Sequence, residues 1–327
     1  MEDIAVLANV SKPTVSRALS NSPLVNRETR EHVLEVARAH GYVVNRNAQK
    51  LRNKRTNTVA VSLDYHSHQG NHISDPFIFE LLAGVSQALG DANQDLLLMA
   101  PSHNDIDSFR HMLTSRGADG FLFLGQGHRE AAIAEFAQTG APLVVWGARR
   151  KNSGYCVVGS NNLLGGELAG RYFINQGRRR LLFVGDTSHA EIYWRSKGLR
   201  KVTDAFKKVR IDEIVPDDLS YDSSYRAAAD WLEHCDHPPD GVFAYNDTAA
   251  LAFLGALRDH GLTVPEEVSV VGYNDIPSAS FSNPPLTTIR QDIYQAGRVL
   301  VSKLMQIIDG KKARSELIKT ELIVRGT

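Results

Sequence analysis

Residues 10–19 read VSKPTVSRAL and have the pattern of a short helix with two unlike faces. Ser11 is a suitable N-cap, and Pro13 falls in the first turn, where its missing N–H costs little. One face is an apolar stripe at i, i+3 and i+4 spacing, made of Val15, Ala18 and Leu19. The opposite face is polar and is made of Lys12, Pro13, Ser16 and Arg17.

Two more helices are predicted beside this one. An upstream apolar stripe of Ile4, Leu7 and Ala8 indicates a helix that meets residues 10–19 at a short turn around Asn9. A third helix should run from about Arg27, capped by Asn26, to a stop at Gly41. The first 44 residues therefore predict an all-α helix-turn-helix unit whose middle helix has the layout of a DNA recognition helix.

The charge distribution points to the same partner. Residues 1–55 contain ten Lys/Arg and five Asp/Glu, a balance of +5, while the remainder carries 27 against 32, a balance of −5. A basic head suits nucleic acid, because Arg can bind guanine edges and short hydroxyls can hold phosphates. Arg17 fits the first role, and Ser11, Thr14 and Ser16 fit the second. The same charges would also suit a solvated face of a small helical bundle.

From Thr58 onward, apolar runs of four to six residues alternate with amphipathic helical stretches, which predicts buried parallel strands and an α/β doubly wound arrangement. Its size favours two sheets. Residues 45–57, rich in Asn, Arg and Lys, form the expected linker. The predicted strands are Val59–Leu63, Leu96–Met99, Gly120–Leu124, Leu143–Trp146, Cys156–Gly159, Leu181–Gly185, Gly241–Tyr245 and Val268–Gly272.

Several function classes find no support. The only two cysteines, Cys156 and Cys235, have no CxxC partner, so neither a disulfide framework nor a cysteine zinc site is predicted. The histidines lack metal-ligand spacing, and no GxSxG, HExxH or P-loop motif occurs. We therefore expect no enzyme activity, metal or cofactor. No apolar run approaches a membrane span and no signal peptide is evident, which predicts a cytoplasmic protein without a membrane partner.

The head resembles the DNA-binding headpiece of the lactose repressor (LacI/GalR) family. The resemblance rests on VSxxTVSRxL at Val10–Leu19, on the pair Thr29 and Arg30, and on GYxxNxxAxxL from Gly41 to Leu51. It implies operator contacts from Ser11, Lys12, Pro13, Thr14, Ser16, Arg17 and Thr29. Family members usually have a few residues before Met1, including the cap of the first helix.

The same resemblance implies that the linker contains a hinge helix that forms on operator DNA. The positions carried over are Asn45, Ala48, Gln49 and Leu51. Leu51 is a lone large apolar residue among Arg46, Lys50 and Arg52, as expected of a wedge in the minor groove flanked by phosphate contacts. Without the resemblance, packing of Leu51 against the core domain would be favoured.

Later motifs such as NNLLGGELAG, VFAYNDTAAL and VSVVGYNDIPSASFSNPPLTTIRQD resemble the family's core, which has the fold of periplasmic sugar-binding proteins. This implies two α/β subdomains with a ligand in the cleft between them. We place the N-subdomain at about 58–160 and 291–317, and the C-subdomain at about 161–290 and 318–327.

The resemblance also implies which residues bind the effector, a small carbohydrate. The carried-over positions are Phe77, Ile78, His189, Glu191, Arg195, Asp222, Asn246 and Asn274. Two of these positions depart from the family pattern. Asn274 stands where the family usually has an Asp, and Asp222 stands where relatives often have an aromatic residue that stacks on the ligand ring. From the residues alone, Arg195 could form a surface ion pair, His189 could be an exposed loop residue, and Trp146 could line the cleft or belong to the core.

Together these features predict a transcriptional regulator, in the first instance a repressor, that binds a pseudo-palindromic operator as a dimer. No leucine-heptad tail follows the last predicted strand, Ile318–Arg325, which favours a dimer over a tetramer. The rival classes are a sugar-binding protein without a DNA function and a sugar-modifying enzyme.

Overall fold

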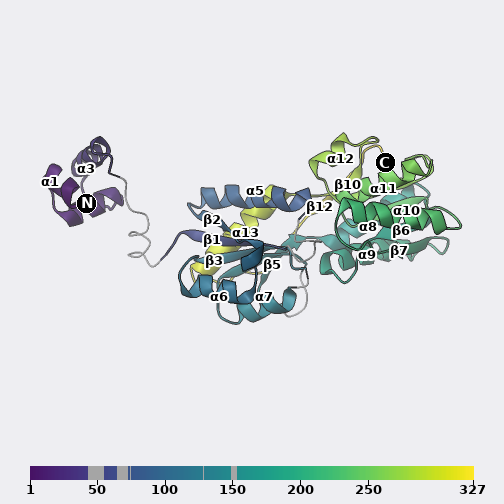
Figure 1. Ribbon diagram of the computed structural model, residues 1–327, viewed down its shortest axis with the longest axis horizontal. Helices are drawn as coiled ribbons and strands as arrows, with labels where there is room; N and C mark the ends of the chain where they lie inside the picture. The colour runs from purple at the N-terminus through teal and green to yellow at the C-terminus, as the bar shows by residue number, and fades with distance from the viewer. Residues whose placement is uncertain (43–54, 65–72, 74, 128, 149–152) are drawn as a thin grey trace. The chain divides into compact units, whose positions relative to one another are not determined.

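The computed structural model describes residues 1–42, 55–64, 73, 75–127, 129–148 and 153–327. The chain forms two compact units, residues 1–56 and 57–327. Figure 1 labels helices and strands of both units.

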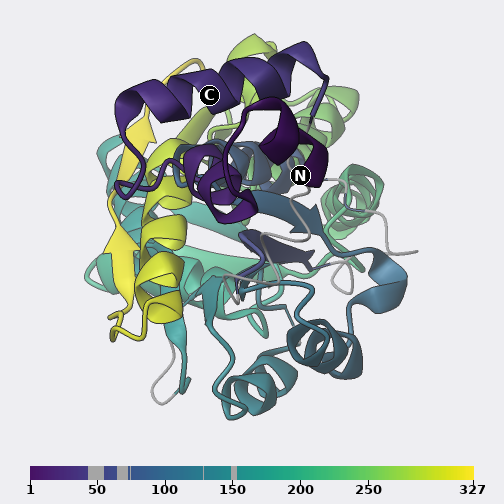
Figure 2. The ribbon, with the colours of Figure 1, turned by 90° about the vertical axis from the view of Figure 1, so that its left-hand side faces the viewer.

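The first unit is a three-helix bundle of α1 (Glu2–Leu7), α2 (Lys12–Leu19) and α3 (Arg27–Ala39), which pack against one another (Figure 2). The predicted caps are present: the Ser11 hydroxyl accepts from the Thr14 N–H, and Asn26 Oδ1 accepts from the Thr29 N–H at 2.8 Å. Leu7 is 50% exposed, so it does not belong to the apolar stripe expected of α1. The buried core is formed by Ile4, Ala5, Ala8, Val15, Ala18, Val25, Val33 and Ala37.

The second unit contains two six-stranded sheets, and the predicted doubly wound α/β fold is confirmed. Sheet A has the order β11-β5-β4-β3-β1-β2, and all its pairs are parallel. Its strands are β1 (Thr58–Leu63), β2 (Asp95–Leu98), β3 (Gly120–Leu124), β4 (Leu143–Trp146), β5 (Cys156–Ser160) and β11 (Glu316–Ile318).

Sheet B has the order β12-β10-β9-β8-β6-β7, parallel except for the pair β10 and β12. Its strands are β6 (Arg180–Val184), β7 (Arg210–Ile214), β8 (Gly241–Ala244), β9 (Ser269–Asn274), β10 (Thr287–Gln291) and β12 (Thr320–Ile323). We call the part built on sheet A the N-subdomain and the part built on sheet B the C-subdomain. The chain crosses between them after β5, after β10 and between β11 and β12.

Helices cover both faces of the sheets. In the N-subdomain, α5 and α13 lie on one face of sheet A and α6 and α7 on the other (Figure 1). The helices of this part are α5 (Pro76–Asp91), η2 (Pro101–His103), α6 (Ile106–Thr114), α7 (Glu130–Ala137) and α13 (Ile293–Ile308). Those of the C-subdomain are α8 (Asn162–Asn175), α9 (Ala190–Thr203), α10 (Tyr221–His234), α11 (Asp247–Asp259) and α12 (Pro277–Phe281).

Helices α8 and α9 cross where two glycines meet. A Cβ on Gly198 would lie 2.1 Å from the Leu163 carbonyl oxygen, and one on Gly166 would lie 2.0 Å from that of Arg195. The glycines therefore allow two helix backbones to touch. The neighbouring Gly165 also lies within α8, but a Cβ there would meet the ring of Tyr273 and not α9.

The eight predicted strands are all present. The sheets contain four further strands, β7, β10, β11 and β12, which were not predicted with these bounds. β7 and β10 were not predicted, because three of the five residues in RIDEI are charged and TTIRQ has only one large apolar residue. The single C-terminal strand expected over Ile318–Arg325 is wrong. The chain changes sheets near Lys319, so Ile318 ends β11 and residues 320–323 form β12. Within the described residues, no helix has the length and apolarity required to cross a membrane.

Candidate functional site

A cleft lies between the two subdomains, where the strands of both sheets end. Asp64 follows β1, Gln126 follows β3, Asn246 follows β8, and Asn274 and Gln291 end β9 and β10. Because parallel strands bring their carboxyl ends to one edge, side chains distant in sequence converge there. The remaining lining residues are Asp75, Phe77, Ile78, Gly125, Gly127, Trp146, Gly147, Ser160, Asn162, His189, Glu191, Ile192, Arg195, Leu219 and Tyr245.

Asp75 connects the two sides of this cleft. Its Oδ1 accepts from the Phe77 N–H at 3.0 Å and so caps α5. Its Oδ2 accepts from Asn246 Nδ2 at 2.8 Å and from Asn274 Nδ2 at 3.4 Å, across the cleft. Gln291 Nε2 in turn donates to Asn274 Oδ1 at 2.6 Å. A network of one carboxylate and three amides therefore joins the N-subdomain to the C-subdomain.

Arg195 is held on the C-subdomain side. Its side chain is buried, Nε donates to Asn162 Oδ1 at 2.9 Å, and Nη1 donates to the Tyr245 carbonyl oxygen. The guanidinium also stacks on the ring of Tyr273. Arg195 is thus a cleft residue fixed by neutral acceptors and an aromatic face, rather than a member of a surface ion pair.

A buried ion pair forms part of the N-subdomain wall. Arg129 Nε lies 3.5 Å from Asp64 Oδ1, and both side chains are about nine-tenths buried. Arg129 also donates to Ser62 Oγ at 2.9 Å and to the Gly125 carbonyl oxygen at 3.0 Å. Burial lowers the pKa of Arg129, and the Asp64 carboxylate opposes this effect. These contacts fix Asp64 at the edge of the cleft.

Aromatic and titratable side chains complete the lining. Phe77 and Trp146 are buried with ring centroids 6.2 Å apart, so Trp146 both lines the cleft and packs in the core. Desolvation raises the pKa of Glu191, while Arg195 and His189 act in the opposite direction. His189 Nε2 lies 3.9 Å from Asp186 Oδ2, and its side chain is mostly buried.

The chemistry of this lining suits a polyol. The carboxylates can accept hydrogen bonds, the guanidinium can donate them, and the amides can do both, while the aromatic rings offer apolar faces. The free volume is about 130 Å³, below the ~300 Å³ of smaller ligand sites. The cleft is therefore closed by its own side chains. Among the described residues, no cluster of His, Cys, Asp or Glu has the arrangement of a metal site.

Seven of the eight expected effector residues line this cleft, and Asp222 does not. It is exposed in the first turn of α10, whose cap is Ser220, and Leu219 is the lining residue from that segment. Sequence reasoning missed Asp64, Asp75, Gln126, Asn162, Tyr245 and Gln291 as lining residues. Most of them end or directly follow a strand, so position after a predicted strand is the signal that could have found them.

The first unit presents the expected DNA-facing residues on its surface. Ser11, Lys12, Pro13 and Arg17 are exposed, whereas Thr14, Ser16 and Thr29 are half-buried. Lys12 Nζ pairs with Glu2 at 2.5 Å, and Arg30 Nη2 donates to the carbonyl oxygens of Ser22 and Val25, which braces the loop before α3. The expected hinge positions lie outside the described residues; these are Asn45, Ala48, Gln49 and Leu51.

Comparison with known proteins accounts for both units. Residues 1–45 match the family described as bacterial regulatory proteins, lacI family, and residues 171–327 match the periplasmic binding protein-like domain. The regulator CelR of Thermobifida fusca is 30% identical over 334 residues, covering 99% of this chain and 97% of that protein. The chain belongs to the LacI family. Proteins of this family are DNA-binding transcriptional regulators and not enzymes.

Other LacI-family relatives have the same extent. The repressor CytR of Escherichia coli K12 is 28% identical over 336 residues, covering 100% of this chain and 95% of that protein. A CelR–cellobiose complex is 29% identical with a TM-score of 0.71, covering 99% of this chain and 98% of that one. A lac repressor dimer bound to operator and the anti-inducer ONPF, 23% identical with a TM-score of 0.84 and coverage of 99% and 97%, supports the fold.

Proposed function

We propose that this LacI-family protein is a transcriptional repressor that binds a pseudo-palindromic operator as a homodimer and releases or tightens it when a small carbohydrate occupies the cleft. The observation that carries the proposal is one chain holding both a helix-turn-helix unit with exposed Arg17 and an inter-subdomain cleft with a polyol-type lining. The protein would act in the cytoplasm, on the nucleoid.

The carbohydrate class is supported from two directions. The network of Asp75, Asn246 and Asn274 provides paired donors and acceptors for vicinal hydroxyls, while Phe77 and Trp146 provide apolar surface. Relatives with solved structures are described with cellobiose and with ribose. The set of cleft residues proposed to bind the effector is Phe77, Ile78, His189, Glu191, Arg195, Asn246 and Asn274.

Dimerisation is supported by an apolar surface on the N-subdomain. Strand β2 is an edge strand of sheet A, and its residues Leu97 and Leu98 are 37% and 41% exposed to solvent. Phe79 on the adjacent α5 is 49% exposed. An exposed apolar edge strand favours pairing with a second copy, because its free backbone groups and side chains can both be buried there.

The deciding experiment selects operator sequences from a random DNA library with the full-length protein and then titrates the complex with a panel of sugars. We expect a selected site with two-fold symmetry and a change in operator affinity with one sugar or a few related ones. Selection of no sequence above random DNA would contradict the proposal.

Two further measurements separate the rival classes. A sugar-binding protein without a DNA function would not show steeply salt-dependent retention on heparin, whereas several phosphate-contacting cations predict such retention. A sugar-modifying enzyme would turn over the sugar that it binds, and incubation followed by chromatography of the sugar would reveal the product.

A further inference from the structure

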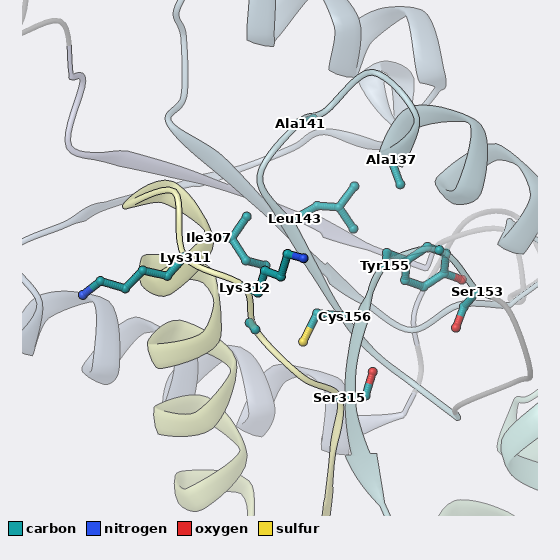
Figure 3. Close-up of a pocket in the computed structure, with 12 residues that line it drawn as sticks. Ala137, Ala141, Leu143, Ser153, Tyr155, Cys156, Ile307, Lys311, Lys312 and Ser315 are labelled. Atoms are coloured by element: carbon teal, nitrogen blue, oxygen red, sulfur yellow. The ribbon is translucent and has the colours of Figure 1, made fainter.

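A second pocket lies in the N-subdomain, away from the cleft. It is bordered by the amino-terminal ends of β4 and β5, where Leu143, Tyr155 and Cys156 lie, and by α7 and α13, which contribute Ala137 and Ile307 (Figure 3). The cleft lies at the opposite, carboxyl ends of these strands. The volume of the second pocket is about 610 Å³, which is within the ~300 to 1,000 Å³ range of small-molecule sites.

The pocket has an apolar floor and a more polar wall that includes Tyr155, Ser315 and Lys312. Leu143 and Cys156 are buried in the floor. Lys312 extends across the pocket toward these two residues, whereas Lys311 points away from them (Figure 3). Lys312 is exposed, so its ammonium group is accessible to an anion and attracts it by charge.

The charge of Lys312 is not neutralised by the described part of the chain. The neighbouring Lys303 is paired with Glu316 at 2.9 Å, but no described carboxylate lies within 4 Å of Lys312 Nζ. The carboxylate of Glu316 is therefore already paired with another lysine. A bound anion would provide the partner that Lys312 lacks.

The backbone holds Lys312 in place over the pocket. Gly310 adopts φ +75° directly after α13, and the Lys311 N–H donates to the Gln306 carbonyl oxygen at 2.9 Å. Three residues after Lys312, Ser315 Oγ accepts from the Val157 N–H at 3.0 Å, which ties the segment to β5. The lysine is thus carried on a short segment anchored at both ends.

We propose that this pocket is a second ligand site, which binds a small organic acid with its carboxylate on Lys312 and its hydrocarbon part against Leu143, Ala137 and Ile307. An organic acid is favoured over a neutral sugar because the pocket combines an accessible ammonium group with an apolar floor. It is favoured over a highly charged phosphate ester because only one ammonium group faces the pocket.

Matched probes test the proposal. Benzoate and benzamide have the same shape and differ in charge, so titration calorimetry of the full-length protein should show benzoate binding at millimolar concentration and benzamide binding much more weakly. Lys312→Glu should weaken benzoate about tenfold or more. Lys207→Glu, which makes the same charge change at an exposed lysine of the C-subdomain, should leave benzoate binding unchanged.

A chemical reporter locates the bound probe. The chain has only two cysteines, so Cys235→Ser leaves Cys156 as the single thiol. Benzoate should slow alkylation of Cys156 by iodoacetamide in this variant, and the protection should disappear when Lys312→Glu is added. The proposal is overturned if benzoate does not bind, or if benzamide binds equally well. It is also overturned if benzoate binds without protecting Cys156 and with an affinity that Lys312→Glu leaves unchanged.

Discussion

The guanidinium carbon of Arg195 lies 3.6 Å from the centroid of the Tyr273 ring. Tyr273 is fully buried, and its hydroxyl lies 3.5 Å from Ser160 Oγ, at the first crossing between the subdomains. Arg195 therefore rests on a rigid aromatic platform, and it presents its charge to the cleft in one orientation.

Replacing Arg195 should separate effector binding from DNA binding. Arg195→Ala removes the cation of the cleft, so we expect sugar affinity to fall about 10- to 100-fold, or ~1.5 to 3 kcal/mol, while operator binding without sugar stays nearly intact. Operator titrations with and without the sugar measure both. Lys197→Ala, on the exposed face of the same helix, should change neither. Loss of sugar-free operator binding in a folded Arg195→Ala protein would refute this division.

On the DNA side, Arg17→Ala should weaken binding to a selected operator by ~1 to 3 kcal/mol and weaken binding to random DNA much less. The reason is that Arg17 is exposed on α2 and free to reach base edges. Arg27→Ala removes the same charge from α3, where Arg27 already pairs with Glu31 at 2.7 Å. It should affect both DNAs alike. Equal losses on operator and random DNA for Arg17→Ala would contradict base recognition.

The glycine crossing of α8 and α9 should not tolerate a methyl group. Gly198→Ala would place a Cβ 2.1 Å from the Leu163 carbonyl oxygen, so we expect a loss of ~1 to 3 kcal/mol or more in the free energy of unfolding. Gly90→Ala in α5 has open space around its Cβ and should stabilise the protein by about 0.5 to 1 kcal/mol. Urea denaturation measures the free energy of unfolding of both variants. Similar values for the two would contradict the prediction, because they would show that α8 and α9 can move apart to accept the methyl group.

Asp247 should give the C-subdomain an unusual pH dependence. Burial raises its pKa to about 7, against ~3.9 for an unfolded aspartate. The folded protein therefore holds this proton more tightly, and the stability it contributes is complete below about pH 4 and is lost as the pH rises through 7. The upper limit of the loss is ~4 kcal/mol.

Asp247→Asn tests this origin, because it keeps an oxygen that can accept from Thr288 or Ile276 but cannot ionise. Urea unfolding at pH 5 and pH 8 should show a smaller stability difference for Asp247→Asn than for the unchanged protein. Asp236→Asn, at an exposed aspartate, should leave the difference as it was. An unchanged difference in Asp247→Asn would mean that another group is responsible.

The elements that the sequence predicted well are those whose pattern is local. VSKPTVSRAL carries its own cap and stripe, and LLFV in β6 or GVFA in β8 marks a strand by a run of buried residues. β7 could not be recognised in this way, because an edge strand buries few of its side chains and RIDEI is mostly polar.

The cleft was less predictable, because its geometry depends on contacts far apart in sequence. Asp75 and Asn274 are 199 positions apart, and only the closure of the two subdomains brings them together. Asp222 was misplaced for a related reason: the segment before α10 reaches the cleft through Leu219, and Asp222 already lies in the exposed first turn of α10.

The bridge from Asp75 to Asn246 and Asn274 has a kinetic consequence. These side chains hydrogen-bond to one another in the narrow cleft, so a ligand must wait for the subdomains to part and then replace those bonds. The association rate constant is then set by how often the cleft opens, rather than by diffusion. The apparent dissociation constant equals the intrinsic one divided by the open fraction. Weakening the bridge would therefore speed effector capture without any new contact to the effector.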